Sequence, residues 1–353
     1  MKNIIVALDS FKQCLTSQEA NEAVASGLAG LVAPDQIKTI TVSDGGEGFL
    51  QAMRPEKTVH CHVHDALMRW TDARFGINGE EAIIEVAEAI GLSKVQPQSR
   101  NPLHATSYGV GELMVHAMDR GCRSFVVGLG GSATSDCGLG MLKCLRKAIQ
   151  TRHNKMWYDA FDTSCLRNLR VTLATDVDNP LYGPLGAAHV FAQQKGASEA
   201  DVEMLDRRAR TFARMAARHQ GYDMSNQPGA GAAGGLGYAF MEFMDTQVRS
   251  GASLVLDGAG FSDALRQASL VITGEGSADR QTLMGKIPCV IMQRAREMGI
   301  PTVLMAGKTS DVDQLLNSGF SKIVNINDGF SLDDALSKEV AKARLGDCVR
   351  RLV

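Results

Sequence analysis

Five segments of this sequence place a polar residue directly after a run of apolar, strand-like residues. Ligands of parallel β-sheets bind at the carboxyl ends of the strands, so polar side chains at several strand ends predict a site at one edge of a sheet. A single Asp at such a position is an ordinary helix cap, but five in one chain favour a ligand site. The five residues are Asp9, Asp44, Ser132, Asp176 and Glu275.

The glycine-rich segment from 128 to 134 is the best candidate for a phosphate cradle. Glycines let backbone amides approach an anion, and the N-terminus of a following helix adds partial positive charge. The alternative is a tight turn that needs glycine only for a positive φ. We predict that Gly130, Gly131, Ser132 and Thr134 bind nucleotide or phosphate groups.

A second glycine-rich segment, from 229 to 234, matches the G-x-G-x-x-G string of dinucleotide-binding proteins. The residues before it, Ser225 to Pro228, do not form a strand pattern, so a nicotinamide dinucleotide site is not expected. A phosphate-binding loop and a closely packed helix start both remain open. On the first interpretation, Gly231 and Gly234 bind phosphate.

Lysines beside these loops could neutralise phosphate charge as mobile point charges. They are Lys12, Lys195 and Lys286, and each also fits a solvated surface lysine. We predict that Lys12, Lys195 and Asp44 are catalytic. Lys12 ranks first, because it lies three residues after Asp9, in a loop between a buried strand and a helix start.

Two groups of residues could bind a metal ion. Asp176 and Asp178 follow a strand at i and i+2, and carboxylates of this kind hold Mg²⁺ together with substrate phosphates. We therefore predict that they are metal ligands. His60, His62 and His64 alternate and would share one face of a strand, but nothing at motif spacing completes a transition-metal site, and a solvated face is the better interpretation.

The apolar pattern predicts an α/β fold of two domains. The start of the chain supplies two strands and the end three, too few for two sheets, whereas together they make one Rossmann-like parallel sheet of about five strands. This domain comprises residues 1–55 and 262–353, and residues 56–261 form an inserted α/β domain with a mixed sheet and glycine-rich loops. The active site is expected in the cleft between the domains. The terminal strands are predicted at 3–8, 37–42, 270–273, 302–305 and 322–326, and the clearest helix start is a capping box at Thr16 to Glu19.

Composition narrows the class of protein. The chain has 353 residues, 44% of them hydrophobic and 22% charged, which is typical of a folded protein. A net charge of −2 and 5% aromatic residues argue against nucleic-acid partners, and no apolar run is long enough for a membrane helix. The eight cysteines include no Cys-x-x-Cys pair, so we expect reduced thiols in a cytoplasmic protein. We leave open whether the protein forms a homo-oligomer.

Taken in order, the motifs of this chain resemble those of the bacterial glycerate kinase family (type I). The resemblance covers nearly the whole chain, with two departures. Gln13–Cys14 stands where the family has Gly-Ser, and Ser135–Asp136–Cys137 stands where it has Asn-Asp-Gly; these bear on substrate tuning. The matching segments are 9–12, 44–48, 100–103, 130–134, 176–181, 194–197, 229–237 and 273–286.

This resemblance implies a kinase that uses ATP and Mg²⁺ to phosphorylate D-glycerate. The expected products are ADP and 2-phosphoglycerate, with 3-phosphoglycerate the alternative. We assign substrate binding to Asp9, Ser10, Asp279 and Lys286. The competing hypotheses are a kinase for another small hydroxy or sugar acid, and a metabolite-sensing module without turnover.

Overall fold

The computed structural model describes residues 3–11, 14–153, 164–330 and 337–352. The chain divides into two compact units, which are described one at a time. The terminal unit comprises residues 1–44, 51–53 and 252–353, and the inserted unit comprises residues 45–50 and 54–251. The sequence places the corresponding boundaries at residues 55 and 262.

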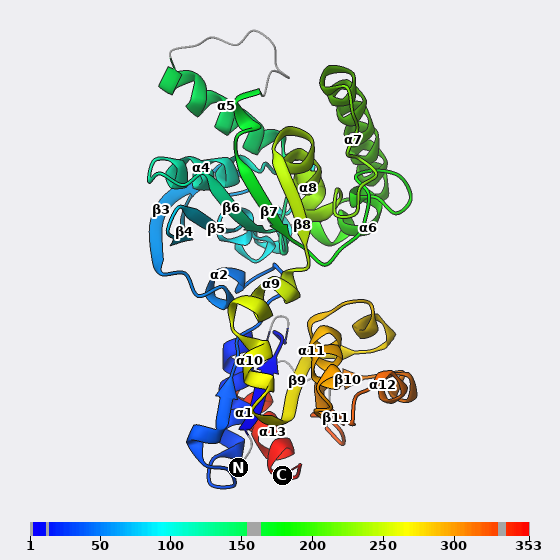
Figure 1. Ribbon diagram of the computed structural model, residues 1–353. Helices are drawn as coiled ribbons and strands as arrows, with labels where there is room; N and C mark the ends of the chain where they lie inside the picture. The colour runs from blue at the N-terminus through cyan, green and yellow to red at the C-terminus, as the bar shows by residue number, and fades with distance from the viewer. Residues whose placement is uncertain (1–2, 12–13, 154–163, 331–336, 353) are drawn as a thin grey trace. The chain divides into compact units, whose positions relative to one another are not determined.

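The terminal unit is built on a five-stranded sheet in the order β11-β10-β9-β1-β2. All neighbouring strands are parallel, and β1 from the start of the chain lies between β2 and β9 (Figure 1). The prediction that both ends of the chain share one parallel sheet is confirmed. The strands are β1 (Asn3–Leu8), β2 (Ile37–Thr39), β9 (Ala268–Ala278), β10 (Thr302–Thr309) and β11 (Lys322–Asn325).

Helices cover both faces of this sheet, which explains why its strands read as continuous apolar runs. On β10, Val303 and Met305 join the core cluster formed with α1 and α13. Leu304 and Ala306, which point to the opposite face, join the cluster with α11 and α12. The predicted capping box at Thr16 is present at the start of α1. The helices are α1 (Ser17–Leu28), α9 (Gly251–Gly258), α10 (Phe261–Leu265), α11 (Ile287–Glu297), α12 (Val312–Ser318) and α13 (Lys338–Arg350), with the 3-10 turns η1 (Pro34–Gln36) and η6 (Arg280–Leu283).

The inserted unit contains a six-stranded mixed sheet in the order β3-β4-β5-β6-β7-β8. The first three strands pair antiparallel and the rest parallel. β4 and β5 are joined by a turn at Asn78–Gly79, where Gly79 has a φ of 56°. The strands are β3 (Lys57–His64), β4 (Trp70–Asn78), β5 (Glu81–Glu85), β6 (Ser124–Gly128), β7 (Arg170–Ala174) and β8 (Asp245–Arg249).

The main core of this unit lies against one face of that sheet. Ile84, Val127 and Leu173 occupy equivalent places on three adjacent strands and are fully buried. They pack with apolar side chains of the helices α4, α5 and α8. The helices are α2 (Phe49–Ala52), which continues into the terminal unit, α3 (Ala87–Ile90), α4 (Tyr108–Met118), α5 (Leu139–His153), α6 (Ala187–Phe191), α7 (Glu199–Gln220) and α8 (Ala232–Phe243), with the 3-10 turns η2 (Leu92–Lys94), η3 (Pro97–Ser99), η4 (Ser164–Leu166) and η5 (Gln193–Lys195).

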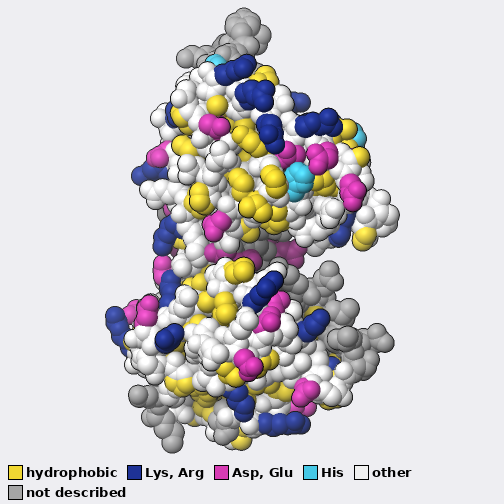
Figure 2. Space-filling model, turned by 90° about the vertical axis from the view of Figure 1, so that its right-hand side faces the viewer, with side chains coloured by type: hydrophobic (Ala, Val, Ile, Leu, Met, Phe, Trp, Pro, Cys, Tyr) yellow, Lys and Arg dark blue, Asp and Glu magenta, His cyan; other side chains and the backbone are white. Residues whose placement is uncertain are grey.

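The surface agrees with the near-neutral charge of the sequence. On the face shown in Figure 2, Lys and Arg side chains are scattered among Asp and Glu side chains, with uncharged surface between them. Among the described helices, none combines the length and apolarity that a membrane crossing requires.

Candidate functional site

The carboxyl ends of β5, β6 and β7 meet at the predicted phosphate cradle. β6 ends at Gly128, whose carbonyl oxygen accepts a hydrogen bond from Val86 N after β5 (3.1 Å). Leu129 N donates to Ala174 O at the end of β7 (3.2 Å). The loop from 128 to 134 therefore begins at the edge of the sheet where parallel strands present ligands.

A second loop contacts this cradle; it comprises residues 45 to 50, of which the last two begin the short helix α2. Gly130 N donates to Gly45 O (2.9 Å), and a Cβ added to Gly130 would come within 2.3 Å of Gly46 Cα. Gly131 has a φ of 72°, a conformation that glycine adopts without strain. Gly130 thus permits a close approach of two backbones, and Gly131 permits the turn; these are the two interpretations of the motif.

Lys195 lies under the cradle. Lys195 is only 3% exposed. Its ammonium Nζ donates hydrogen bonds to Ser132 Oγ (3.1 Å) and Thr134 O (2.7 Å). Burial lowers the pKa of Lys195 to about 8, against a smaller raising effect of Asp136. The structure therefore brings one predicted catalytic residue together with two predicted phosphate-binding residues.

Asp136 fixes the C-terminal side of the cradle. Its carboxylate accepts hydrogen bonds from Ser107 N (2.8 Å) and Ser107 Oγ (2.9 Å), and from Gly138 N (3.1 Å) and Gly140 N (3.0 Å). In the sequence, Asp136 stands out only as part of the departure Ser135–Asp136–Cys137 from the family pattern. Its carboxylate stabilises the turn into α5 and supplies a negative charge near Lys195.

Two hydroxyl groups, one at the end of the cradle and one in the next residue, are buried without a hydrogen-bond partner among the described residues. They are Thr134 Oγ1 and Ser135 Oγ. A buried hydroxyl that makes no hydrogen bond costs free energy, so unsatisfied groups at a glycine loop fit a site completed by polar ligand atoms. This observation and the buried ammonium suit the phosphates of a nucleotide.

The second glycine-rich segment packs tightly against the first. Ala233, Gly234 and Gly235 all have positive φ values, of 51°, 67° and 88°, and a Cβ on Gly234 would come within 2.0 Å of Thr134 O. Gly231 N donates to Asn179 O (2.8 Å). The structure thus supports the close-packing interpretation, while phosphate binding by Gly231 and Gly234 stays a prediction.

The predicted metal ligands follow β7, beside the cradle. Asp176 is half-buried and Asp178 is exposed. Among the described residues no group of three or more His, Cys, Asp or Glu side chains could hold a metal ion, whereas Mg²⁺ needs only one or two carboxylates when phosphates supply other ligands. The donor set at this strand end fits that mode.

Other predicted site residues lie in the terminal unit, at the carboxyl end of its sheet. Asp9 N donates to Gly274 O (2.8 Å), and Ser10 N donates to Asp9 Oδ1 (2.6 Å). Asp44 is half-buried, and the strand before it, β2, ends at Thr39 rather than at the predicted residue 42. Lys12 lies outside the described residues.

The carboxyl-terminal part of β9 and the residues that follow it form a compact polar cluster in the same unit. Glu275 is 6% exposed and accepts hydrogen bonds from Thr282 Oγ1 (2.6 Å) and Lys286 Nζ (3.2 Å). Thr282 Oγ1 in turn accepts from Asp279 N (3.1 Å), and Asp279 caps the turn η6. Predicted substrate-binding residues Asp279 and Lys286 are therefore joined by one network, and the side chain of Lys286 is 39% exposed.

The histidines of β3 form separate contacts. His62 Nδ1 lies 2.8 Å from Asp72 Oδ1, and His64 Nδ1 lies 2.8 Å from Glu112 Oε1. His60 is exposed. The exposure of His60 and His62 agrees with the solvated-face interpretation, whereas the side chain of His64 is only 19% exposed.

The inserted unit combines parallel strand ends, a glycine cradle and a buried lysine, which are features of α/β enzymes that bind phosphate groups. Residues 4–353 match the model of the glycerate kinase family. A glycerate kinase of Bacillus subtilis is 36% identical, covering 94% of this chain and 92% of the relative. A glycerate 2-kinase of Escherichia coli is 33% identical, covering 92% and 90%.

The comparison of structures agrees. A crystal structure from Salmonella typhimurium LT2, described as a candidate glycerate kinase 2, superposes with a TM-score of 0.75 and 32% identity, covering 99% of this chain and 97% of that chain. The chain belongs to the glycerate kinase family. It is therefore a phosphotransferase, as the motif resemblance implied.

Proposed function

We propose that this enzyme transfers the γ-phosphoryl group of ATP to the 2-hydroxyl of D-glycerate, giving ADP and 2-phosphoglycerate. The relative in Escherichia coli is named a glycerate 2-kinase, which favours the 2-hydroxyl over the 3-hydroxyl. The observation that carries the proposal is the buried ammonium of Lys195 on Ser132 and Thr134, inside a glycine cradle at three strand ends.

Phosphoryl transfer is catalysed mainly by positioning and by neutralisation of charge. Backbone amides of the loop from 128 to 134 would hold phosphate oxygens, and Lys195 would place a positive charge beneath them. Desolvation strengthens this interaction, because a charge in a water-poor site is screened weakly. Lys12 and Asp44 remain proposed catalytic residues, the former as a second cation on the transferred group.

Asp176 and Asp178 would hold Mg²⁺ with the phosphates of ATP. The ion would supply charge neutralisation on phosphate oxygens. In this assignment, the two carboxylates orient the nucleotide from the end of β7 while the cradle contacts its phosphates from the end of β6.

Glycerate carries a carboxylate and two hydroxyl groups, and the terminal unit offers complementary groups. Lys286 would bind the carboxylate, and Asp9, Ser10 and Asp279 would bind the hydroxyl groups. We propose that residues of both units serve one reaction. A cytoplasmic location remains part of the proposal, because scattered cysteines without a Cys-x-x-Cys pair are typical of proteins of a reducing compartment.

The test is ADP release measured with a coupled assay and a panel of small hydroxy acids. We expect release with D-glycerate that exceeds that with any other acid by at least about tenfold in kcat/KM, a difference of about 1.4 kcal/mol. A different preferred acid would favour the rival sugar-acid kinase. Binding of an acid without any turnover would favour the sensing module.

A further inference from the structure

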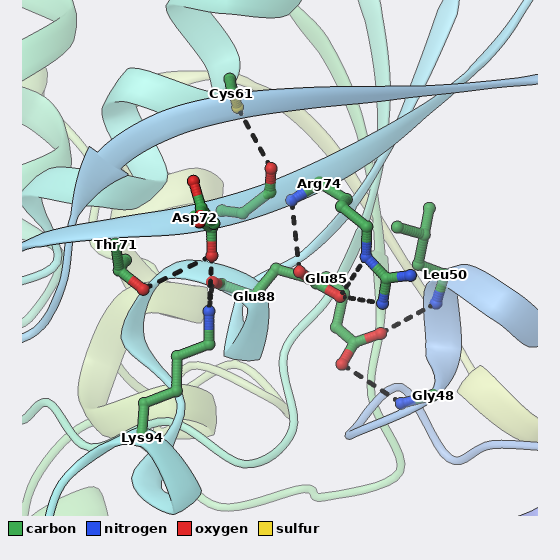
Figure 3. Close-up of polar contacts among 10 residues, drawn as sticks. Gly48, Leu50, Cys61, Thr71, Asp72, Arg74, Glu85, Glu88 and Lys94 are labelled. Carbon is green, nitrogen blue, oxygen red and sulfur yellow. Dashed lines mark hydrogen bonds and ion pairs between the residues drawn. The ribbon is translucent and has the colours of Figure 1, made fainter.

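Glu85, at the carboxyl end of β5, carries a buried carboxyl group and is not one of the predicted site residues. The residue is 5% exposed. Its Oε1 accepts a hydrogen bond from Gly48 N (3.2 Å), and its Oε2 accepts one from Leu50 N (3.0 Å) (Figure 3). One carboxyl group thus holds two backbone amides of the loop from 45 to 50.

The nearby cationic side chains are bonded to groups other than the Glu85 carboxyl group. The guanidinium of Arg74, on β4, pairs with Glu88 instead, at 2.6 Å (Figure 3). Lys94 donates to the carbonyl oxygens of Asp72 and Glu88. Among the described residues, Glu85 accordingly has no cation bonded to it.

Its surroundings place the titration of Glu85 near neutral pH. Burial, with smaller contributions from the negative charges of Glu88 and Glu47, raises the pKa of Glu85 to about 7. The amides of Leu50 and Gly48 act in the opposite direction. Protonation turns one acceptor oxygen into a donor, so the neutral form cannot hold both amides equally well.

The loop that Glu85 holds is in contact with the phosphate cradle. Gly45 O accepts from Gly130 N (2.9 Å), and a Cβ on Gly45 would come within 2.4 Å of Ala174 O. A Cβ on Gly128 would likewise come within 2.6 Å of Gly45 O. Because these backbones touch without spare room, a shift of one loop displaces the other.

We propose that Glu85 is a positioning residue for phosphoryl transfer, fixing the loop from 45 to 50 against the cradle through its two backbone hydrogen bonds. The inference rests on the proposed function. Glu85 touches no substrate in this account. It acts through the loop, which in turn fixes the cradle residues that hold the phosphates.

The test compares Glu85→Gln with Glu88→Gln. Both variants remove one carboxylate from the same region, but only the first alters the groups that hold Gly48 and Leu50. Two quantities are measured from pH 5.5 to 8.5: hydrogen-exchange protection of the segment from 45 to 52, and the kinetic constants for ATP and D-glycerate.

In the wild type we expect protection of this segment to fall by about tenfold between pH 8 and pH 6, which is the effect of one lost charge-assisted hydrogen bond. We also expect kcat to decrease below about pH 7, which gives its pH profile an acid limb. Glu85→Gln should lower protection at pH 8 and reduce kcat by at least about tenfold with KM for ATP changed less than about threefold. The acid limb should disappear. Glu88→Gln should keep wild-type protection of the segment at pH 8 and should retain an acid limb, displaced to lower pH because the charge of Glu88 raises the pKa of Glu85.

Glu85→Gln with wild-type protection of the segment, or with an unchanged acid limb, would overturn the proposal. If Glu85→Gln does not fold, Glu85→Asp, which withdraws the carboxylate from both amides, takes its place. If the wild type shows no glycerate-dependent turnover, the proposed function fails. The positioning claim is then decided by exchange alone: ATP should protect the segment in the wild type and not in Glu85→Gln, and equal protection would overturn it.

Discussion

The ammonium of Lys195 donates a hydrogen bond of 3.1 Å to the hydroxyl of Ser132, although the two residues are 63 positions apart in the chain. One follows the short helix α6 and the other belongs to the loop after β6. This contact turns a glycine-rich turn into a site with a fixed positive charge. Under the proposed function, its removal is expected to have the most direct consequence for catalysis.

Replacing Lys195 with Met should reduce kcat by about 10²–10³, the size of effect seen when one donor to developing negative charge is removed. The pKa of about 8 adds a test in wild-type enzyme. The kcat/KM for ATP should fall above pH 8, because the neutral amine attracts phosphate weakly. A profile that stays flat to pH 9.5 would contradict a charged role for Lys195.

Stability should respond to the same group with a defined sign. The folded pKa of Lys195 lies below its ordinary value of 10.5, so the folded state releases its proton first and the free energy of unfolding should rise between pH 8 and 10.5. The full shift is worth about 3 kcal/mol. Lys195→Met should lack this rise when both proteins are unfolded with urea across this range.

Gly234→Ala should be far more damaging than Gly221→Ala. Both glycines have positive φ values, of 67° and 82°, but a Cβ on Gly221 meets no atom within 4 Å, whereas one on Gly234 meets Thr134 O at 2.0 Å. Gly221→Ala, the control, should therefore lower the free energy of unfolding by about 1 kcal/mol, through backbone strain alone, and keep its activity. Gly234→Ala should lower the free energy of unfolding by about 3 kcal/mol or more and should also lower kcat. Equal losses in urea unfolding would mean that the contact with the cradle is unimportant.

Much of the fold could be predicted because its signals are local. The apolar runs that form β1, β9 and β10 are buried on both faces, so they stand out from polar neighbours, and the capping box marks the start of α1. The strand β8 was missed. Its residues, Asp245 to Arg249, are mostly exposed at the edge of the sheet, so they carry no apolar pattern.

The candidate site could be predicted only in part, because its decisive features depend on tertiary contacts. The glycine loops are visible in the sequence, but nothing in Gln193–Gln194–Lys195 shows that the lysine is buried. Glu85 ends an ordinary strand pattern and carries no motif. Its role depends on amides about 35 residues away, which a reading of local spacing cannot reveal.

Lys286→Met should mainly weaken substrate binding. Its ammonium is held 3.2 Å from Glu275 Oε2 and is partly exposed, which suits a cation that meets the glycerate carboxylate. We expect KM for glycerate to rise by about tenfold or more, with a smaller change in kcat. Lys322→Met, at the amino end of β11, is the control and should leave both constants unchanged. An unaltered KM in Lys286→Met would remove this residue from the substrate site.

Asp176→Asn should raise the Mg²⁺ concentration needed for half-maximal activity. A neutral amide is a weaker ligand for a hard cation than a carboxylate, and a shift of about tenfold is expected. Asp35→Asn, in an exposed turn, should titrate like the wild type. If Asp176→Asn also gives the wild-type titration and rate, Asp176 is a turn residue and not a metal ligand.

The most direct measurement of the central claim is phosphorus NMR of the product formed from ATP and D-glycerate. We expect a new phosphomonoester resonance that coincides with added 2-phosphoglycerate, together with formation of ADP. A resonance that coincides with 3-phosphoglycerate would contradict transfer to the 2-hydroxyl. No new phosphomonoester from folded, ATP-binding enzyme would contradict glycerate phosphorylation altogether.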